Sequence, residues 1–293
     1  MLKIRKVLDR LLSVCFWLCI LLLVWLTLLV TSFASFRIPS DSMEPSILPG
    51  DNILVNKWVI GGRIFNIWKA VEGKDVNIFR LPGFGKIKHN DVLVFNFPYP
   101  ASWDSIGINL HTYYVKRCVA LPGDSFEIKD SRYMVKGYNG TLGPEESEYR
   151  MKQILSSGKE QINDVIMNSF PLDDSIGWTI ENFGPLFIPS EGSTVKMTPT
   201  NCKLYRNVIE WEQKKKLVLK GNSVMLGDSL ISEYMFCKNY YFVAGDNRIN
   251  SQDSRYWGLL PEEFIVGKTT LIWKSVDPNT GKIRWDRLFK KIR

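Results

Sequence analysis

The chain has 293 residues, of which 45% are hydrophobic, 13% aromatic and 23% charged, and 38 Lys and Arg outweigh 30 Asp and Glu to give a net charge of +8. This length allows one large domain or two modest ones, and the aromatic content is too high for a disordered chain. The positive excess comes without a recognition-helix, zinc or RNA-binding pattern, which argues against a nucleic-acid partner.

The N-terminal segment is apolar enough to cross a membrane. No charged residue occurs from Leu11 to Phe36, whereas about 20 apolar residues suffice to span the hydrocarbon core as a helix. The residues before this run carry four cations and one acid, Asp9. The positive-inside rule therefore places the N-terminus in the cytoplasm and the rest of the chain outside the membrane. We expect residues 1–36 to form a basic cytoplasmic tip and a single transmembrane anchor.

A cleaved secretory signal is the alternative interpretation of this segment. Ser32-Phe33-Ala34 supplies the small-x-small pattern that such cleavage needs. The apolar core of a secretory signal, however, is only about 7–15 residues long. The longer run in this chain favours an uncleaved anchor.

Beyond the anchor, short runs of alternating apolar residues predict strands, and helical periodicity is rare. The expected helices are 144–155 and 200–213. We therefore predict a mainly β fold, with an antiparallel β domain at 37–137 and 238–293 and an inserted α+β region at 138–237, whose role stays open. The expected strands are 52–60, 91–97, 113–121, 126–135 with a break at 129–132, 240–244 and 264–273.

The residue types available for catalysis are limited. His89 and His111 are the only histidines, and neither lies in a metal-ligand pattern such as His-Glu-x-x-His. We expect both to be ordinary surface or strand-end residues, and we expect neither a metal nor an organic cofactor. A serine nucleophile with a base other than histidine is the remaining route to hydrolysis.

Four segments support this route together. They read IPSDSMEPSILPGDNILVNK at 38–57, NDVLVFNFP at 90–98, YYVKRCVALPGD at 113–124 and GDNRINSQDSRYWGLLP at 245–261. In order and spacing, and behind an N-terminal anchor, they resemble the signature segments of bacterial signal peptidase I. This family consists of membrane-bound Ser-Lys endopeptidases that remove signal peptides from exported proteins.

In the first segment, the resemblance implies that Ser42 is the nucleophile. It also implies that the Ser40 hydroxyl and the Ser42 backbone N–H form the oxyanion hole. Asp41 stands where many members of the family carry glycine, and we expect its carboxylate to point into solvent. A turn or cap is the alternative interpretation of Ser-x-Ser alone. Met43, Pro45 and Ile47 fit either an apolar rim at the membrane surface or a packed core.

In the third segment, Lys116 matches the general base of the family. Strand alternation places Lys116 on one face with Tyr114, Cys118 and Ala120, and Arg117 on the other. A lysine base requires such an apolar setting, because burial disfavours the ammonium form. The alternative is a strand lysine with its amine in water.

In the last segment, Ser251 matches the serine that orients the base. Asp253 and Arg255 match residues that support the site, and Asp246 lies in a turn that returns the chain to it. A solvated ion pair is the alternative for Asp253 and Arg255.

The resemblance implies cleavage of secreted preproteins after small-x-small sites, with the substrate bound as an added strand. It places the chain in the bacterial inner membrane with its catalytic domain on the periplasmic side. Membrane lipid is then a partner, and the secretion translocon is a further candidate partner. The rival functions are another kind of Ser-Lys protease and a non-catalytic membrane-tethered β domain that binds exported chains.

Three cysteines lie outside the anchor: Cys118, Cys202 and Cys237. We expect Cys118 to be buried beside Lys116 and unpaired. In an oxidising compartment, Cys202 and Cys237 are then the expected intramolecular disulfide.

Overall fold

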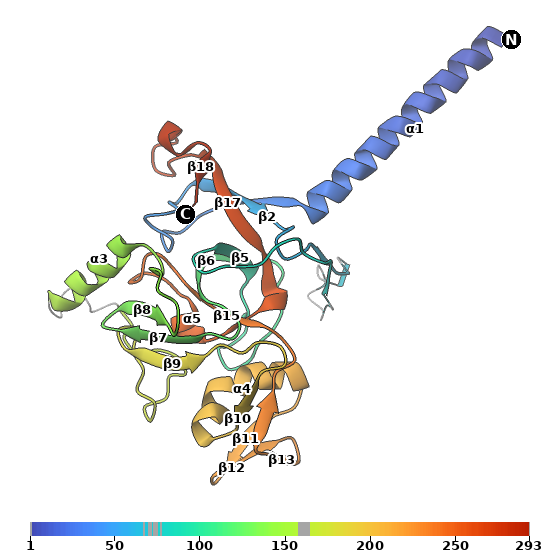
Figure 1. The fold of residues 1–293 in the computed structure, drawn as a ribbon. Helices are drawn as coiled ribbons and strands as arrows, with labels where there is room; N and C mark the ends of the chain where they lie inside the picture. Colours follow the sequence, from blue (N-terminus) through green and yellow to red (C-terminus); the bar gives the residue numbers. More distant parts are fainter. Residues whose placement is uncertain are drawn as a thin grey trace.

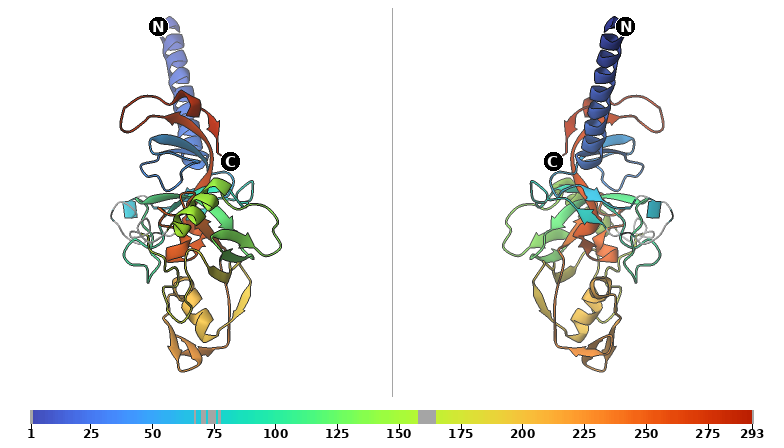
Figure 2. Two further views of the ribbon diagram at one scale, coloured as in Figure 1. Left: turned by 90° about the vertical axis from the view of Figure 1, so that its left-hand side faces the viewer. Right: turned by 90° about the vertical axis from the view of Figure 1, so that its right-hand side faces the viewer.

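The computed structural model describes residues 2–66, 68, 69, 72, 76, 78–157 and 165–292. A long helix, α1 (Leu2–Thr31), projects from one end of the folded body (Figures 1 and 2). Its stretch Asp9–Leu28 is long and apolar enough to cross a membrane, and none of it is buried by the rest of the protein. The prediction of one N-terminal apolar helix is confirmed.

The helix ends earlier than the apolar run does. Residues Phe33–Arg37 form strand β1, which pairs in antiparallel register with β2 (Asp51–Asn56). The inner side chains of β1, Ala34 and Phe36, pack against a buried cluster. Apolarity alone cannot distinguish a helix from a strand, and here pairing with β2 satisfies the backbone of residues 33–37.

The main sheet is antiparallel throughout and contains eight strands in the order β1-β2-β17-β5-β6-β15-β16, with β18 also on β17. The rings of Phe36 on β1 and Tyr113 on β6 lie 4.9 Å apart, although three strands separate β1 from β6. The sheet therefore curls until these two strands face each other. The remaining bounds are β5 (Val92–Asn96), β6 (Tyr113–Ala120), β15 (Tyr240–Ala244), β16 (Leu260–Pro261), β17 (Ile265–Ser275) and β18 (Lys290–Lys291).

Smaller sheets and helices complete the body, which is mainly antiparallel β as predicted. The segment around α4 lies at the end of the body opposite α1 (Figure 2). The bounds are β3 (Arg63–Ile64) with β4 (Phe79–Arg80); β7 (Ser125–Lys129), β8 (Arg132–Val135) and β9 (Phe183–Phe187); β10 (Thr194–Lys196) with β14 (Glu233–Met235); β11 (Leu217–Lys220), β12 (Ser223–Leu226) and β13 (Ser229–Ile231); helices α3 (Glu145–Ser156), α4 (Pro199–Gln213) and α5 (Ser254–Trp257); and 3₁₀ turns η2 (Glu262–Phe264) and η3 (Trp285–Arg287).

The expected insert 138–237 shares a sheet with the catalytic part of the chain. Strand β9, inside the insert, pairs with β7, which precedes it. Helices α3 and α4 lie within one residue of the expected bounds, and Gly158, expected to end α3, falls outside the described residues. The division into domains remains a prediction.

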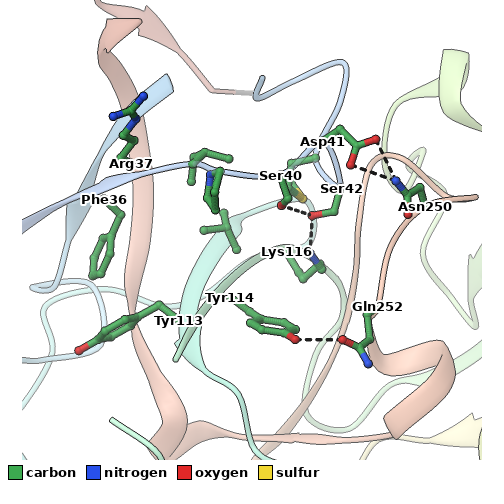
Figure 3. Close-up of a pocket in the computed structure, with 14 residues that line it drawn as sticks. Phe36, Arg37, Ser40, Asp41, Ser42, Tyr113, Tyr114, Lys116, Asn250 and Gln252 are labelled. Atoms are coloured by element: carbon green, nitrogen blue, oxygen red, sulfur yellow. Dashed lines mark hydrogen bonds between the residues drawn. The ribbon is translucent and has the colours of Figure 1, made fainter. Parts of the chain in front are cut away.

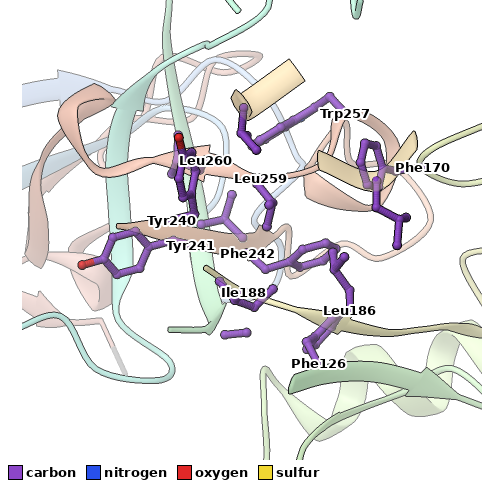
Figure 4. Close-up of a cluster of buried hydrophobic side chains, with 14 of the residues drawn as sticks. Phe126, Phe170, Leu186, Ile188, Tyr240, Tyr241, Phe242, Trp257, Leu259 and Leu260 are labelled. Atoms are coloured by element: carbon purple, nitrogen blue, oxygen red, sulfur yellow. The ribbon is translucent and has the colours of Figure 1, made fainter. Parts of the chain in front are cut away.

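Two cores lie on opposite faces of the main sheet. Along β5, Leu93 and Phe95 enter the larger core, whereas Val92 and Val94 enter the smaller one, as expected for a strand buried on both faces. Figure 4 shows part of the larger core, built on β15 and its neighbours. Met43 and Ile47 are buried in the smaller core, so they are core residues, whereas Pro45 remains exposed.

The five cysteines are all free thiols. Cys118 is buried, as predicted. The predicted disulfide between Cys202 and Cys237 is wrong for this structure, because Cys202 is buried in the larger core on α4 while Cys237 is exposed.

Candidate active site

Ser42 lies in the connection between β1 and β2. The Ile38 N–H donates to the Asp51 carbonyl, and the Gly50 N–H donates to the Ile38 carbonyl, so the two ends of this connection are tied together. Buried Met43, the next residue, anchors it in the smaller core. The nucleophile predicted from the sequence therefore sits on a fixed turn and not on a free loop.

Lys116 on β6 reaches this turn from across the curled sheet. Its Nζ lies 2.7 Å from the Ser42 Oγ, and the residue is only 4% exposed. An ammonium would donate along this line, and a neutral amine would accept the hydroxyl proton along the same line. The structure thus brings the two predicted catalytic residues into hydrogen-bond contact.

Burial changes the protonation of this lysine. It lowers the pKa of Lys116 from 10.5 to about 8, against the opposing effect of nearby carboxylates, of which Asp253 is the strongest. Neutral amine is therefore present in a substantial fraction near pH 8, where a solvated lysine would be almost fully protonated. The alternative of a solvated strand lysine is wrong for this structure.

Ser40 lies on the open side of Ser42. Its Oγ is 3.5 Å from the Ser42 Oγ, and Ser40 is exposed to the pocket. Within the part of the chain that the structure describes, the Ser42 N–H makes no hydrogen bond. Both donors of the expected oxyanion hole are therefore available to a ligand.

Ser251 lies close to Gly245 and to the turn that carries Ser42. It is buried, and its Oγ has no hydrogen-bond partner among the described residues. A Cβ on Gly245 would lie 2.1 Å from that Oγ and 2.5 Å from the Ser42 carbonyl, so only glycine allows this close approach. Ser251 thus packs behind the catalytic pair without a hydrogen bond to Lys116, and its orienting role remains a prediction.

Two ion pairs support the site from the inside. Arg255 forms a two-bond fork with Asp253, with both distances 2.8 Å, and both side chains are 0% exposed. Arg117 forms a similar fork with Asp246, at 2.7 and 2.6 Å, on the face of β6 opposite Lys116. The solvated-pair alternative is wrong, because both pairs are buried and fasten the 245–255 segment.

Asp41 does not point into free solvent as expected. Its carboxylate accepts hydrogen bonds from Asn250 Nδ2 at 3.0 and 2.9 Å and from Asn247 Nδ2 at 3.3 Å. The two asparagines come from the same segment as Ser251 and carry no role predicted from the sequence. Their only signal was their position beside Ser251 in the last signature segment.

A pocket of about 380 Å³ opens over Ser42 and Lys116 (Figure 3). One end is formed by Phe36 and Tyr113, and the other by Asp41 and Asn250. Tyr114 and Gln252, joined by a 3.0 Å hydrogen bond, line it as well. The pocket therefore offers an apolar end, beside which Arg37 lies, a polar end, and the Ser42 hydroxyl between them.

The histidines lie outside this pocket. His89 Nε2 is 2.7 Å from Asp124 Oδ2, and the centroid of the His89 ring lies 4.3 Å from the centroid of the Tyr138 ring. His111 is an exposed loop residue. Among the described residues, no group of three or more His, Cys, Asp or Glu is placed to hold a metal ion.

Comparison with known proteins agrees with this geometry. The family model for signal peptidase, peptidase S26, matches residues 10–274. Signal peptidase I of Buchnera aphidicola subsp. Baizongia pistaciae (strain Bp) is 30% identical over 268 residues, covering 86% of this chain and 74% of the relative. Signal peptidase I of Aquifex aeolicus (strain VF5) is 28% identical over 254 residues, covering 82% and 75%. The chain belongs to the signal peptidase family S26 and is a serine peptidase of the signal peptidase I type.

Proposed function

We propose that this protein cleaves N-terminal signal peptides from exported preproteins after small-x-small sites, with Ser42 and Lys116 as a catalytic dyad. The observation that carries the proposal is the 2.7 Å contact between the buried Lys116 amine and the Ser42 hydroxyl. A nucleophile needs an adjacent base at this distance, and burial supplies the neutral amine.

The chemistry follows from the protonation of Lys116. The neutral amine takes the Ser42 proton as Oγ attacks the scissile carbonyl. Lys116 then returns this proton to the nitrogen of the breaking peptide bond, so the mature protein leaves with a free amine and Ser42 is left as an acyl-enzyme ester. A water molecule, activated by the same amine, then hydrolyses the ester and restores the Ser42 hydroxyl. No metal or organic cofactor takes part in this scheme.

The oxyanion is stabilised by the two free donors beside Ser42. The Ser42 N–H and the Ser40 hydroxyl, whose Oγ lies 3.5 Å from the Ser42 Oγ, are the donors assigned to the carbonyl oxygen of a bound substrate, and both residues line the pocket. Hydrogen-bond donors that the fold already holds in place stabilise the oxyanion more than water does, because they need not reorganise as the charge develops.

Strand β6 has a free edge to which an extended substrate can bind. Strand β6 pairs with β5 along Tyr113–Arg117, but its other edge pairs with β15 only from Arg117 onward. Residues 113–116 at this free edge line the pocket together with residues 36–43. An extended peptide can therefore add to this edge as a strand, with its small side chains in the apolar end of the pocket.

The proposed location is the bacterial inner membrane, with the N-terminus in the cytoplasm and the catalytic body on the periplasmic side. The cations before the apolar stretch of α1 support this orientation. The anchor places Ser42 near the membrane surface, where the cleavage site of a translocated preprotein emerges. Lipid and the secretion translocon are the partners that such a position implies.

Cleavage of a model preprotein by the full chain in detergent micelles tests the proposal. The wild type should release a mature protein whose N-terminal sequence begins after a small-x-small site, and Ser42→Ala should release none. Ser156→Ala, an exposed hydroxyl at the end of α3, is the matched control and should cleave as the wild type does. Stable binding of the preprotein without cleavage by the wild type would instead favour a non-catalytic binding domain.

A further inference from the structure

Asp41 is a carboxylate beside the nucleophile without a cationic partner. Its hydrogen bonds come from the amides of Asn247 and Asn250, which are neutral and leave its negative charge in place. Among the described residues, Asp246 and Asp253 each pair with an arginine, whereas no Lys or Arg nitrogen forms an ion pair with Asp41. The pocket therefore carries at one end a carboxylate that no ion pair neutralises, with Lys116 in electrostatic range of it and Arg37 at the opposite end.

The anchor indicates which part of a substrate meets this anion. Helix α1 leads directly into β1, whose Phe36 lies at the end of the pocket away from Asp41 (Figure 3). The apolar core of a signal peptide precedes its cleavage site and lies in the same membrane as α1. Residues before the cleaved bond therefore approach from the Phe36 end, and residues after it leave over Asp41.

The Asp41 charge also affects the protonation of Lys116. Burial lowers the pKa of Lys116, and the Asp41 carboxylate is one of the groups that oppose this shift. A neutral residue at position 41 would favour the neutral amine more strongly. The Asp41 carboxylate thus disfavours the neutral form of Lys116. Its charge favours the binding of a substrate that carries a cation beside it.

We propose that Asp41 is a specificity-determining residue, whose carboxylate pairs with a Lys or Arg side chain in the first two residues of the mature protein. This inference rests on the proposed function and names the preproteins that the same site prefers. The Asn247 and Asn250 amides orient the carboxylate, and a long basic side chain can reach it from an extended strand. The pair forms at the rim of the pocket, where water has access, so its effect is moderate.

The wild type alone provides the first test. Model preproteins that differ only at the first or second mature residue, with Lys, Gln or Glu there, are cleaved by the full chain in neutral detergent micelles. At low salt, kcat/KM should fall about three- to five-fold from Lys to Gln and again from Gln to Glu, as expected for a partly exposed ion pair. About 0.5 M salt should bring the Lys-to-Gln and Gln-to-Glu ratios of kcat/KM closer to 1, because salt screens exposed charges. Equal kcat/KM for all three residues at both positions would overturn the inference.

Variants at position 41 provide the second test. In Asp41→Asn, which keeps the shape and one acceptor, the Lys-to-Gln ratio should fall to about 1, and Asp41→Ser should give the same ratio with a smaller neutral side chain. Glu233→Gln, an exposed carboxylate on β14, is the matched control and should keep the wild-type ratio. An unchanged ratio in either Asp41 variant that cleaves would contradict the inference.

The two proposals fail in distinguishable ways. If the wild type cleaves no preprotein, or if Ser42→Ala cleaves as well as the wild type, the proposed function is wrong. If cleavage depends on Ser42 but the three substrates are cleaved equally, only the role of Asp41 is wrong.

Discussion

The Lys116 side chain combines two features that a lysine base requires. Strand alternation turns it away from Arg117, whose guanidinium is neutralised by Asp246, and burial removes water from its amine. The pKa of about 8 is the balance between that burial and the surrounding carboxylates. The position of the residue on β6 therefore sets its chemistry.

The pH dependence of cleavage should report this balance. Because the active form is the neutral amine, kcat/KM should rise with pH through an apparent pKa of about 8, whereas a solvated lysine would titrate near 10.5. Lys116→Ala and Lys116→Arg should each lose several orders of magnitude in kcat, since a guanidinium cannot accept the proton. Initial rates on a model preprotein from pH 6 to 10 would measure both effects.

The two histidines supply the control for this prediction. His89→Asn combined with His111→Asn should retain most of the activity, because neither imidazole lies at the pocket. Near-normal cleavage by a folded Lys116→Ala protein would show that the base has been misassigned.

The free thiols should differ in reactivity. Cys237 is exposed, whereas Cys118 is buried in the core and its pKa is raised well above the ordinary value by burial. A maleimide should therefore label Cys237 in the native protein, and Cys118 and Cys202 only after denaturation. Mass spectrometry of labelled protein, with and without prior reduction, checks this; a Cys202–Cys237 bridge in unreduced protein would contradict it.

At the scale of elements, the C-terminal segment holds the turn that carries Ser42. From η3, Arg287 binds Asp51 with its shortest contact at 2.6 Å and donates to the Ser46 carbonyl at 3.0 Å, while Arg284 donates to the Pro49 carbonyl. The Arg287–Asp51 pair is buried, with side-chain exposures of 6% and 0%. The end of the chain thus fixes the first catalytic segment.

Removing one partner of this pair should be costly. Arg287→Ala leaves Asp51 buried without its cation, and we expect it to lower the free energy of unfolding by about 3–5 kcal/mol. Arg287→Lys should lose less, because it keeps the charge. Denaturant unfolding of the full chain in micelles measures the change, with exposed Lys290→Ala as the control. If Arg287→Ala lowered the free energy of unfolding no more than Lys290→Ala does, the Arg287–Asp51 pair would not stabilise the turn.

At the scale of the whole molecule, α1 and the segment around α4 lie at opposite ends (Figures 1 and 2). The pocket is lined by Phe36 and Arg37 of β1, the strand that directly follows α1. If α1 spans the membrane as proposed, this shape keeps Ser42 near the bilayer and extends the far end of the body away from it. The role of that far end remains open.

The orientation in the membrane is a prediction of the charge distribution. Protease added to the periplasmic side of intact spheroplasts should digest the body after Arg37, because the cations before the apolar stretch hold the N-terminus in the cytoplasm. A tag fused to the N-terminus should remain protected until the membrane is lysed. Digestion of the tag and protection of the body would reverse the topology.

Local patterns in the sequence determined much of this protein. The charge-free run predicted α1, alternation predicted β5, β6 and β15, and the signature segments singled out Ser42 and Lys116 before any distance was known. Each of these signals lies within a short stretch of chain. Periodicity and composition are local properties, so they can be read without the fold.

Only the tertiary structure decided the features that depend on distant contacts. The helix ends at Thr31 because β2 pairs with residues 33–37, Asp41 is held by Asn250 more than 200 residues away, and the Asp253–Arg255 pair is buried by the packing around it. The same packing buries Cys202 and leaves Cys237 exposed, each as a free thiol. Burial and partner choice arise when segments far apart in sequence meet, and no local pattern specifies which segments those are.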